Sequence, residues 1–161
     1  MPSLVDVYAK FGEVAEAAQL LETQLGNLLI EVSIGSHDSE IADAKAFSRA
    51  LFEEVDRRTL GQLIKMLRMS KQFAHTLEGE LATALTDRNR LSHSFYRDHN
   101  FRRNTEDGRA IMLTDLEVIH ARVLHAYVEV LRLSGIDLTA AKVFGMPTEH
   151  LELQAKPHQH Q

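Results

Sequence analysis

The chain has 161 residues, of which 44% are hydrophobic and 25% are charged, which suits one folded domain rather than a disordered chain. It contains no cysteine, which excludes disulfides, cysteine nucleophiles and thiolate metal sites and fits a reducing compartment. A net charge of −5 argues against a generic nucleic-acid binder, which is usually basic overall. No apolar run is long enough to span a membrane, and the first residues lack the pattern of a signal peptide. We therefore expect a cytoplasmic protein.

Apolar residues alternate at spacings of three and four from residue 4 to residue 32, which predicts one long helix with a continuous apolar seam. The seam consists of Leu4, Val7, Phe11, Val14, Ala18, Leu21, Leu25, Leu28 and Val32. A helix of this length spans about 45 Å, more than a small domain needs. We therefore expect a homodimer in which a second copy covers part of the seam. The alternative is that other helices of the same chain cover all of it.

The remaining elements are also predicted to be helical. A weaker helical period follows over residues 41–55. A capping box at Thr59 and Gln62 opens a short helix whose apolar face is Leu60, Leu63, Ile64 and Leu67. The next helix is expected from Lys71 to about Tyr96.

A loop is expected from His99 to Gly108, and a second capping box at Thr114 and Glu117 then opens the last long helix. Ser134 and Gly135 are expected to end that helix, and residues 140–144 to add one short turn. No segment shows the alternation of a strand. The sequence predicts an all-α fold, an antiparallel bundle of four long helices and one short helix over residues 1–146, followed by a polar tail over residues 147–161.

Arg88 interrupts the apolar seam of the helix predicted from Lys71. The seam is Leu77, Leu81, Ala84, position 88, Leu91 and Phe95. A guanidinium in an inward-facing stripe is costly unless it reaches a wet cleft or pairs with a carboxylate. We expect Arg88 in a solvent-accessible cleft, and the alternative is a structural ion pair. Residues 88–103 hold five arginines and one aspartate, a net charge of +4 that leaves −9 for the rest of the chain.

The hexapeptide Arg88-Asn89-Arg90-Leu91-Ser92-His93 resembles the signature of HEPN domains, in which four to six residues separate an arginine from a histidine late in a helix of an all-α bundle. Many HEPN proteins are metal-independent endoribonucleases of toxin or defence systems. They act as homodimers in which two such motifs line one cleft. The resemblance implies an RNA substrate, a homodimer and, in the toxin branch, a cognate antitoxin protein. It implies no metal and no cofactor.

The residue chemistry suits cleavage of RNA by its own 2′-hydroxyl. A histidine can accept the 2′-hydroxyl proton or protonate the leaving oxygen, and an arginine can stabilise the phosphate charge. We therefore assign Arg88 and His93 as candidate catalytic residues and Asn89 as a supporting residue. Candidate substrate contacts are Arg90, Tyr96 and Arg97. Because positions 88 and 93 lie about 140° apart on a straight helix, a second subunit or a bend would be needed to align them.

One other interpretation stays open at this point. Non-catalytic HEPN-like proteins exist, so the chain could be a helical dimer that binds a nucleotide or another protein.

The chain departs from one branch of the family and lacks one competing motif. Toxins paired with nucleotidyltransferase antitoxins have tyrosine two residues after the histidine, where this chain has Phe95, which argues against an antitoxin of that type as the partner. Glu117 and His120 have the Glu-x-x-His spacing of di-iron bundles, but the sequence holds no second copy of that motif. We expect no metal site.

Overall fold

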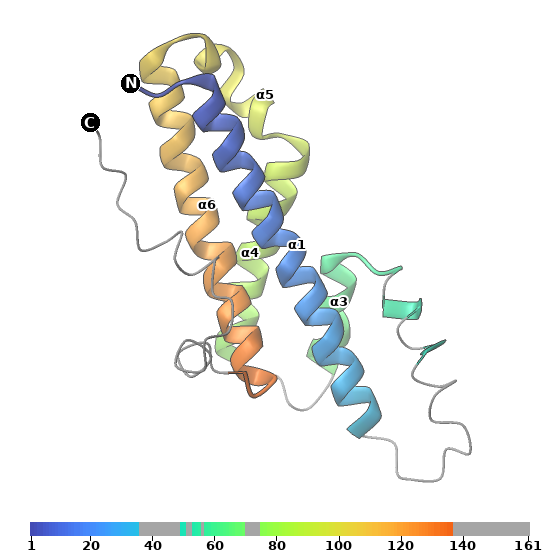
Figure 1. The fold of residues 1–161 in the computed structure, drawn as a ribbon. Coiled ribbons are helices and arrows are strands. Elements are labelled where there is room, and N and C mark those ends of the chain that lie inside the picture. Colours follow the sequence, from blue (N-terminus) through green and yellow to red (C-terminus); the bar gives the residue numbers. More distant parts are fainter. Residues whose placement is uncertain (36–48, 51–52, 56, 70–74, 137–161) are drawn as a thin grey trace.

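A computed structural model describes residues 1–35, 49–50, 53–55, 57–69 and 75–136. Every secondary-structure element in this part of the chain is helical (Figure 1), which confirms the all-α class. The elements are α1 (Leu4–Gly35), α3 (Leu60–Met69), α4 (His75–His93), α5 (Phe95–His99), the 3-10 helix η1 (Asn100–Asn104) and α6 (Glu106–Leu133). Most of the helix predicted over 41–55, the turn at 140–144 and the tail at 147–161 lie outside the described residues.

The three long helices α1, α4 and α6 pack side by side, with α3 against the second half of α1 (Figure 1). Contacts between α1 and α6 join Lys10 to His120 and Gln24 to Ser134, so these two helices run in parallel. Contacts between α4 and α6 join Arg90 to Asp115 and Asp87 to Arg122, so this pair is antiparallel. The predicted antiparallel arrangement is therefore right for α4 against α6 and wrong for α1 against α6.

The apolar seam of α1 is covered mostly within one chain. Six of its nine members are buried, namely Val7, Val14, Ala18, Leu21, Leu25 and Leu28. Leu4, Phe11 and Val32 are partly exposed. The predicted length of this helix is confirmed. The seam itself is not an argument for a second copy, since α3, α4 and α6 already bury most of it.

The helix predicted from Lys71 to Tyr96 is interrupted at Ser94. The backbone of Ser94 has φ −137° and ψ −11°, which lies outside the helical region, and α5 begins at the next residue. The amide of Ser94 still donates to the Arg90 carbonyl at 2.9 Å, and the amide of Asp98 donates to the Ser94 carbonyl at 2.8 Å. The helix is therefore broken at Ser94 although these two backbone hydrogen bonds are kept, a break that apolar spacing alone does not predict.

The last helix begins earlier than predicted. Thr105 is its N-cap, and the Thr105 hydroxyl accepts a hydrogen bond from the Gly108 amide at 3.1 Å. The predicted capping box at Thr114 was wrong, because Thr114 lies in the interior of α6. The expected loop at 99–108 is instead the end of α5, the η1 turn and the first residues of α6.

Two other helix ends follow the sequence prediction. The amide of Thr59 donates to the Gln62 side chain at 2.9 Å, which is one half of the predicted capping box at the start of α3. At the end of α6, Gly135 has φ +72°, and the amide of Ile136 donates to the Leu131 carbonyl at 2.9 Å. This is a Schellman arrangement, which favours glycine at that position.

Candidate functional site

The inward-facing position of α4 belongs to Asp87 and not to Arg88. Asp87 is 6% exposed and lies between the buried residues Ala84 and Leu91. The spacings 84–87–91 and 84–88–91 are both compatible with a helix, so the sequence did not distinguish them. Asp87 is paired with Arg122 of α6, with 3.4 Å between its Oδ2 and the arginine Nη1. The placement of Arg88 in the seam was therefore wrong by one residue.

Arg88 forms an ion pair with Glu22 of α1. The distance between its Nη2 and Glu22 Oε1 is 3.0 Å, and the side chains are 29% and 27% exposed. A second nitrogen, Nη1, donates to the Asn89 side-chain oxygen at 3.3 Å. Both alternatives considered for Arg88 therefore hold in part, because the guanidinium reaches solvent and also pairs with a carboxylate.

His93 is the last residue of α4, and its side chain is exposed. Within the described residues, the His93 side chain makes no hydrogen bond or ion pair. Arg88 and His93 lie in one continuous helix, so they point in directions about 140° apart, and no bend in α4 brings them together. The break at Ser94 comes one residue too late to align them.

Arg90 is fully engaged with carboxylates. It donates to both oxygens of Asp115 on α6, at 2.8 Å from Nη1 and 2.6 Å from Nη2. Its Nε also lies 3.3 Å from Asp98 Oδ2 on α5. This fork-to-fork geometry ties α4, α5 and α6 together, and it argues against Arg90 as a free contact for substrate phosphate.

A buried histidine that the sequence did not indicate joins the same network. His99 is buried, and its Nε2 lies 2.6 Å from Asp115 Oδ2. Nη1 of Arg102 lies 3.2 Å from His99 Nδ1. Because a guanidinium is only a donor, Nδ1 must be the acceptor, so the neutral ring carries its proton on Nε2 and donates it to Asp115. Treating residues 99–108 as a loop concealed this role.

The network shifts the pKa of each carboxyl group downward. Hydrogen bonds from Arg90 lower the pKa of Asp115 most, with burial opposing them and His99 adding to the decrease. The Ser94 hydroxyl, which donates to Asp98 Oδ2 at 2.8 Å, is the largest cause of the lowered pKa of Asp98. The hydrogen bond to Asp115 likewise raises the pKa of Arg90. The carboxylates are thus stabilised in their charged forms.

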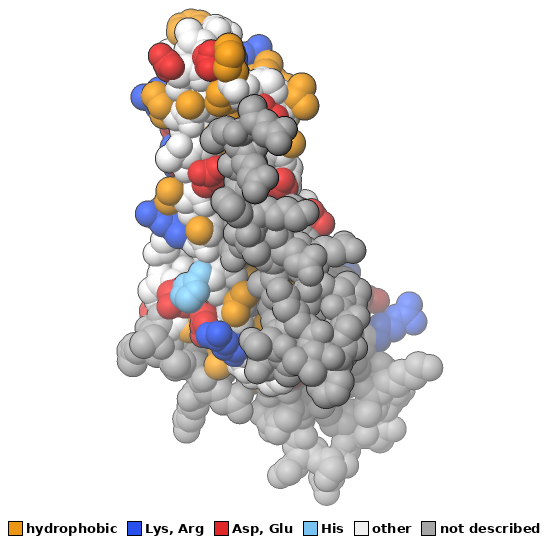
Figure 2. All heavy atoms as spheres, turned by 60° about the vertical axis from the view of Figure 1, so that its left-hand side comes forward, with side chains coloured by type: hydrophobic (Ala, Val, Ile, Leu, Met, Phe, Trp, Pro, Cys, Tyr) orange, Lys and Arg blue, Asp and Glu red, His pale blue; other side chains and the backbone are white. Residues whose placement is uncertain are grey.

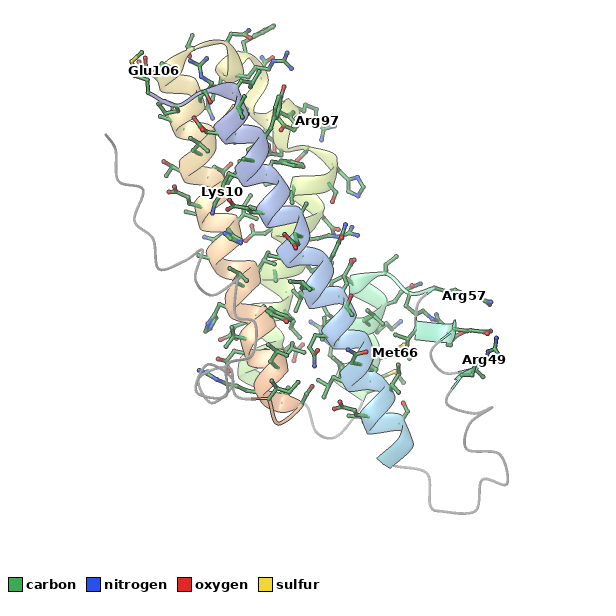
Figure 3. The ribbon with its side chains drawn as sticks, in the orientation of Figure 1. Lys10, Arg49, Arg57, Met66, Arg97 and Glu106 are labelled. Atoms are coloured by element: carbon green, nitrogen blue, oxygen red, sulfur yellow. The ribbon has the colours of Figure 1, made fainter. Side chains whose placement is uncertain are left out.

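Tyr96 and Arg97 lie on α5 at the end of the bundle. The ring of Tyr96 is 5.2 Å from Phe11 and 5.3 Å from Phe95, measured between ring centroids. Arg97 is exposed, and Figure 3 labels it on α5, far from Arg57. Burial raises the pKa of Tyr96, Tyr8 adds to the increase and Arg103 opposes it. Of the predicted substrate contacts, Tyr96 and Arg97 are therefore accessible.

His120 is engaged in a different contact from the one that its Glu-x-x-His spacing would require. Its Nδ1 lies 2.9 Å from Nζ of Lys10, a contact that joins α6 to α1. Lys10 also pairs with Glu13, one turn later on α1, at 2.9 Å. Lys10 is labelled in Figure 3. Within the described part of the chain, no group of three or more His, Asp or Glu side chains is arranged to hold a metal ion.

Comparisons with protein-family models, curated proteins and solved structures gave no match. The resemblance to HEPN domains therefore rests on the hexapeptide from Arg88 to His93 and on the helical class. No helix among the described residues has the length and hydrophobicity needed to cross a membrane.

Proposed function

We propose that this protein is a metal-independent endoribonuclease of the HEPN type that acts as a homodimer. In this proposal, His93 exchanges protons with the 2′-hydroxyl and the leaving oxygen, and Arg88 stabilises the charge on the scissile phosphate. Asn89 orients the Arg88 guanidinium, to which it is hydrogen-bonded. A cognate antitoxin protein and a cytoplasmic location belong to the same proposal.

The observation that carries the proposal is the accessibility of both motif residues near one end of α4. His93 is exposed, and Arg88 keeps 29% of its side chain in contact with solvent although it pairs with Glu22. Arg97, exposed on α5, lies one turn beyond His93 in sequence and supplies further positive charge. These are the groups that a phosphodiester with a neighbouring hydroxyl would need.

The need for a second copy follows from the straightness of α4. Arg88 and His93 of one chain diverge by about 140°, so one phosphate cannot contact both side chains of the same helix without a rearrangement. A twofold dimer would place His93 of one chain opposite Arg88 of the other. The case for a dimer is therefore the geometry of the motif and not the seam of α1.

The second candidate function is a non-catalytic helical dimer that binds a nucleotide or a protein. The ion pair between Arg88 and Glu22 favours this alternative, because a guanidinium that already has a carboxylate partner gains less from a phosphate. In that case, the same arginines would bind an anionic ligand without reaction, and the protein would not cut RNA.

Incubation of the purified protein with RNA in the presence of EDTA tests the proposal. We expect cleavage with 2′,3′-cyclic phosphate and 5′-hydroxyl ends, and we expect DNA of the same sequence to survive because it lacks the 2′-hydroxyl. His93→Ala should abolish cleavage, and Arg88→Ala should lower the rate by about 10² or more. Intact RNA after incubation with the wild-type protein would favour the non-catalytic alternative.

Matched substitutions separate chemistry from general effects. His125 is another exposed histidine, and its Nε2 lies 3.3 Å from Glu80 Oε1. Arg68 is paired with Glu78 on the neighbouring helix much as Arg88 is paired with Glu22. His125→Ala and Arg68→Ala should keep the wild-type cleavage rate. Equal losses in these controls would show that the catalytic assignment is wrong.

A further inference from the structure

We infer that Tyr8 and Tyr96, with Arg103 beside them, bind the unpaired bases of single-stranded RNA by stacking. We call these three residues the tyrosine platform. The inference rests on the proposed function, and it names the substrate class and a contact residue on α1 that the motif does not include. Tyr96 is an expected substrate contact, whereas Tyr8 lies nearly ninety positions earlier in the sequence.

The two tyrosines lie side by side although 88 positions separate them in the sequence. Their ring centroids are 6.3 Å apart and the planes meet at 62°, an edge-to-face contact. Tyr8 is 48% exposed and Tyr96 is 36% exposed, so each ring keeps part of its surface free. Phe101, on η1 at the same end of the bundle, is 74% exposed. Apolar side chains that gather in one exposed patch, unlike single exposed ones, are typical of an interaction site.

Two further rings pack against the platform, Phe11, which is partly buried, and Phe95, which is buried. Phe11, one turn after Tyr8 on α1, lies 5.2 Å from Tyr96 and 5.7 Å from Phe95 between centroids. Phe95 is fully buried and also contacts His99 at 4.5 Å. The hydrogen-bonded network of His99 and Asp115 holds α5 against α6. Rings that are held in this way lose little conformational entropy when a base stacks on them.

Positive charge lies next to the rings. Arg103 lies on η1, the turn that directly follows α5, and its charge opposes the rise in the pKa of Tyr96. Arg97 and Arg103 are exposed, and within the described residues neither forms an ion pair with a carboxylate. Figure 2 shows hydrophobic and basic side chains at this upper end of the molecule, with acidic ones among them. Rings for bases and cations for phosphates are the two contacts that single strands require.

The combination favours single-stranded RNA over other anionic ligands. A base pair in a duplex offers no free face to a tyrosine, because its neighbours already stack on it. An acidic peptide would engage the arginines and would gain little from the rings. Stacking also leaves the choice of base open, since each base has a π face.

Binding of a 12-nucleotide 2′-O-methyl oligouridine with a fluorescent label tests the inference, because this probe lacks the hydroxyl needed for cleavage. Fluorescence anisotropy should show that Tyr8→Ala weakens binding at least fivefold, in line with the loss of one stacked base. Tyr8→Phe should restore the binding that Tyr8→Ala loses. Arg103→Ala should weaken binding and lower the slope of log affinity against log salt by about one.

Matched controls lie at the other end of the molecule. Arg57 is an exposed arginine and Met69 an exposed apolar residue, both distant from α5 (Figure 3 labels Arg57). Arg57→Ala and Met69→Ala should leave the affinity within twofold of wild type. Binding of a 12-base-pair RNA duplex should be insensitive to Tyr8→Ala. Circular dichroism should confirm that Tyr8→Ala stays folded, as expected for a half-exposed side chain.

The inference is overturned if the wild-type protein does not bind the oligouridine, or if Tyr8→Ala binds it as well as wild type does. Stronger binding to polyglutamate than to the oligouridine, unaffected by Tyr8→Ala, would assign the surface to an acidic protein and would also overturn it. The proposed function fails separately. If the protein binds the probe through Tyr8 but leaves unmodified RNA intact, the tyrosine platform stands and the proposed nuclease activity is wrong. If the protein cleaves RNA with a KM that Tyr8→Ala does not change, the nuclease activity stands and the platform is wrong.

Discussion

Asp115 is the residue on which the polar network depends. It accepts hydrogen bonds from Arg90 and His99, so Asp115→Asn removes a charge from both contacts and leaves the buried imidazole with a poorer acceptor. Because the carboxylate is 22% exposed, solvent moderates the loss, and we expect the free energy of unfolding to fall by about 2 kcal/mol. Urea unfolding measures this change.

Glu53→Gln is the control for Asp115→Asn. It makes the same change of charge in an exposed ion pair with Arg49, and we expect an effect within about 0.5 kcal/mol. Equal effects of the two substitutions would mean that the hydrogen bonds of Asp115 contribute no more stability than the charge of an exposed carboxylate.

The lowered pKa of Asp115 predicts a dependence of stability on acid. Its pKa in the folded protein lies below the ordinary value of 3.8, so the unfolded chain binds more protons between those two values. The stabilisation is present above about pH 4 and is lost as the pH falls through the lower, folded pKa. Asp115→Asn should therefore lose less stability than the wild type between pH 5 and about pH 2.5. Parallel curves for the two proteins in urea unfolding would contradict this expectation.

Asn100 adopts a backbone conformation that favours glycine. Its φ of +47° with ψ of −119° lies outside the region that a side chain tolerates well, and it follows His99 directly. Asn100→Gly should raise the free energy of unfolding by about 1 kcal/mol, and Asn100→Val should lower it by a larger amount. Thermal unfolding of the three proteins checks the order; a stability for Asn100→Gly below wild type would show that the Asn100 side chain contributes more than the strain costs.

At the scale of elements, Gly108 allows the first turn of α6 to pack closely against the backbone of η1. A Cβ at this position would lie 2.1 Å from the Arg102 carbonyl oxygen, a backbone atom that cannot rotate away. Gly108→Ala should therefore lower the free energy of unfolding by about 3 kcal/mol. Gly79, on the exposed side of α4, has nothing within 4 Å of its Cβ position. Gly79→Ala should raise stability by about 0.5–1 kcal/mol through helix propensity. Similar effects of the two alanines in urea unfolding would contradict this account.

The elements with strong apolar periodicity are the ones that the sequence predicts well. The length of α1 and one half of the capping box of α3 are confirmed. The start of α6 was missed because two Thr residues precede acidic side chains, and only packing against η1 selects Thr105 over Thr114 as the cap. The break at Ser94 was missed because the apolar spacing continues through Phe95, so periodicity does not record the interruption.

At the scale of the whole molecule, contacts between distant helices decide the candidate site. The sequence identifies Arg88 and His93, but it does not show that Glu22, 66 positions earlier, pairs with Arg88. The sequence also does not show that Asp115 binds Arg90 and His99. Nothing in the sequence distinguishes Glu22 or Asp115 from the other acidic residues of the helices. The parallel course of α1 and α6, set by the connections between helices, likewise escapes apolar periodicity.

Mixed dimers test whether the site is shared between two copies. In a shared site, Arg88→Ala protein still supplies His93 and His93→Ala protein still supplies Arg88, so a heterodimer of the two has one intact site. Random exchange of subunits makes about half of the dimers mixed, and each has one of two sites, so the mixture should recover about a quarter of wild-type activity although each variant alone is nearly inactive. Sedimentation should show a species of twice the 18.2 kDa chain mass at micromolar concentration. No recovery from a mixture whose subunits have exchanged, or a monomer that cleaves RNA, would place the complete site within one chain and require α4 to rearrange when substrate binds.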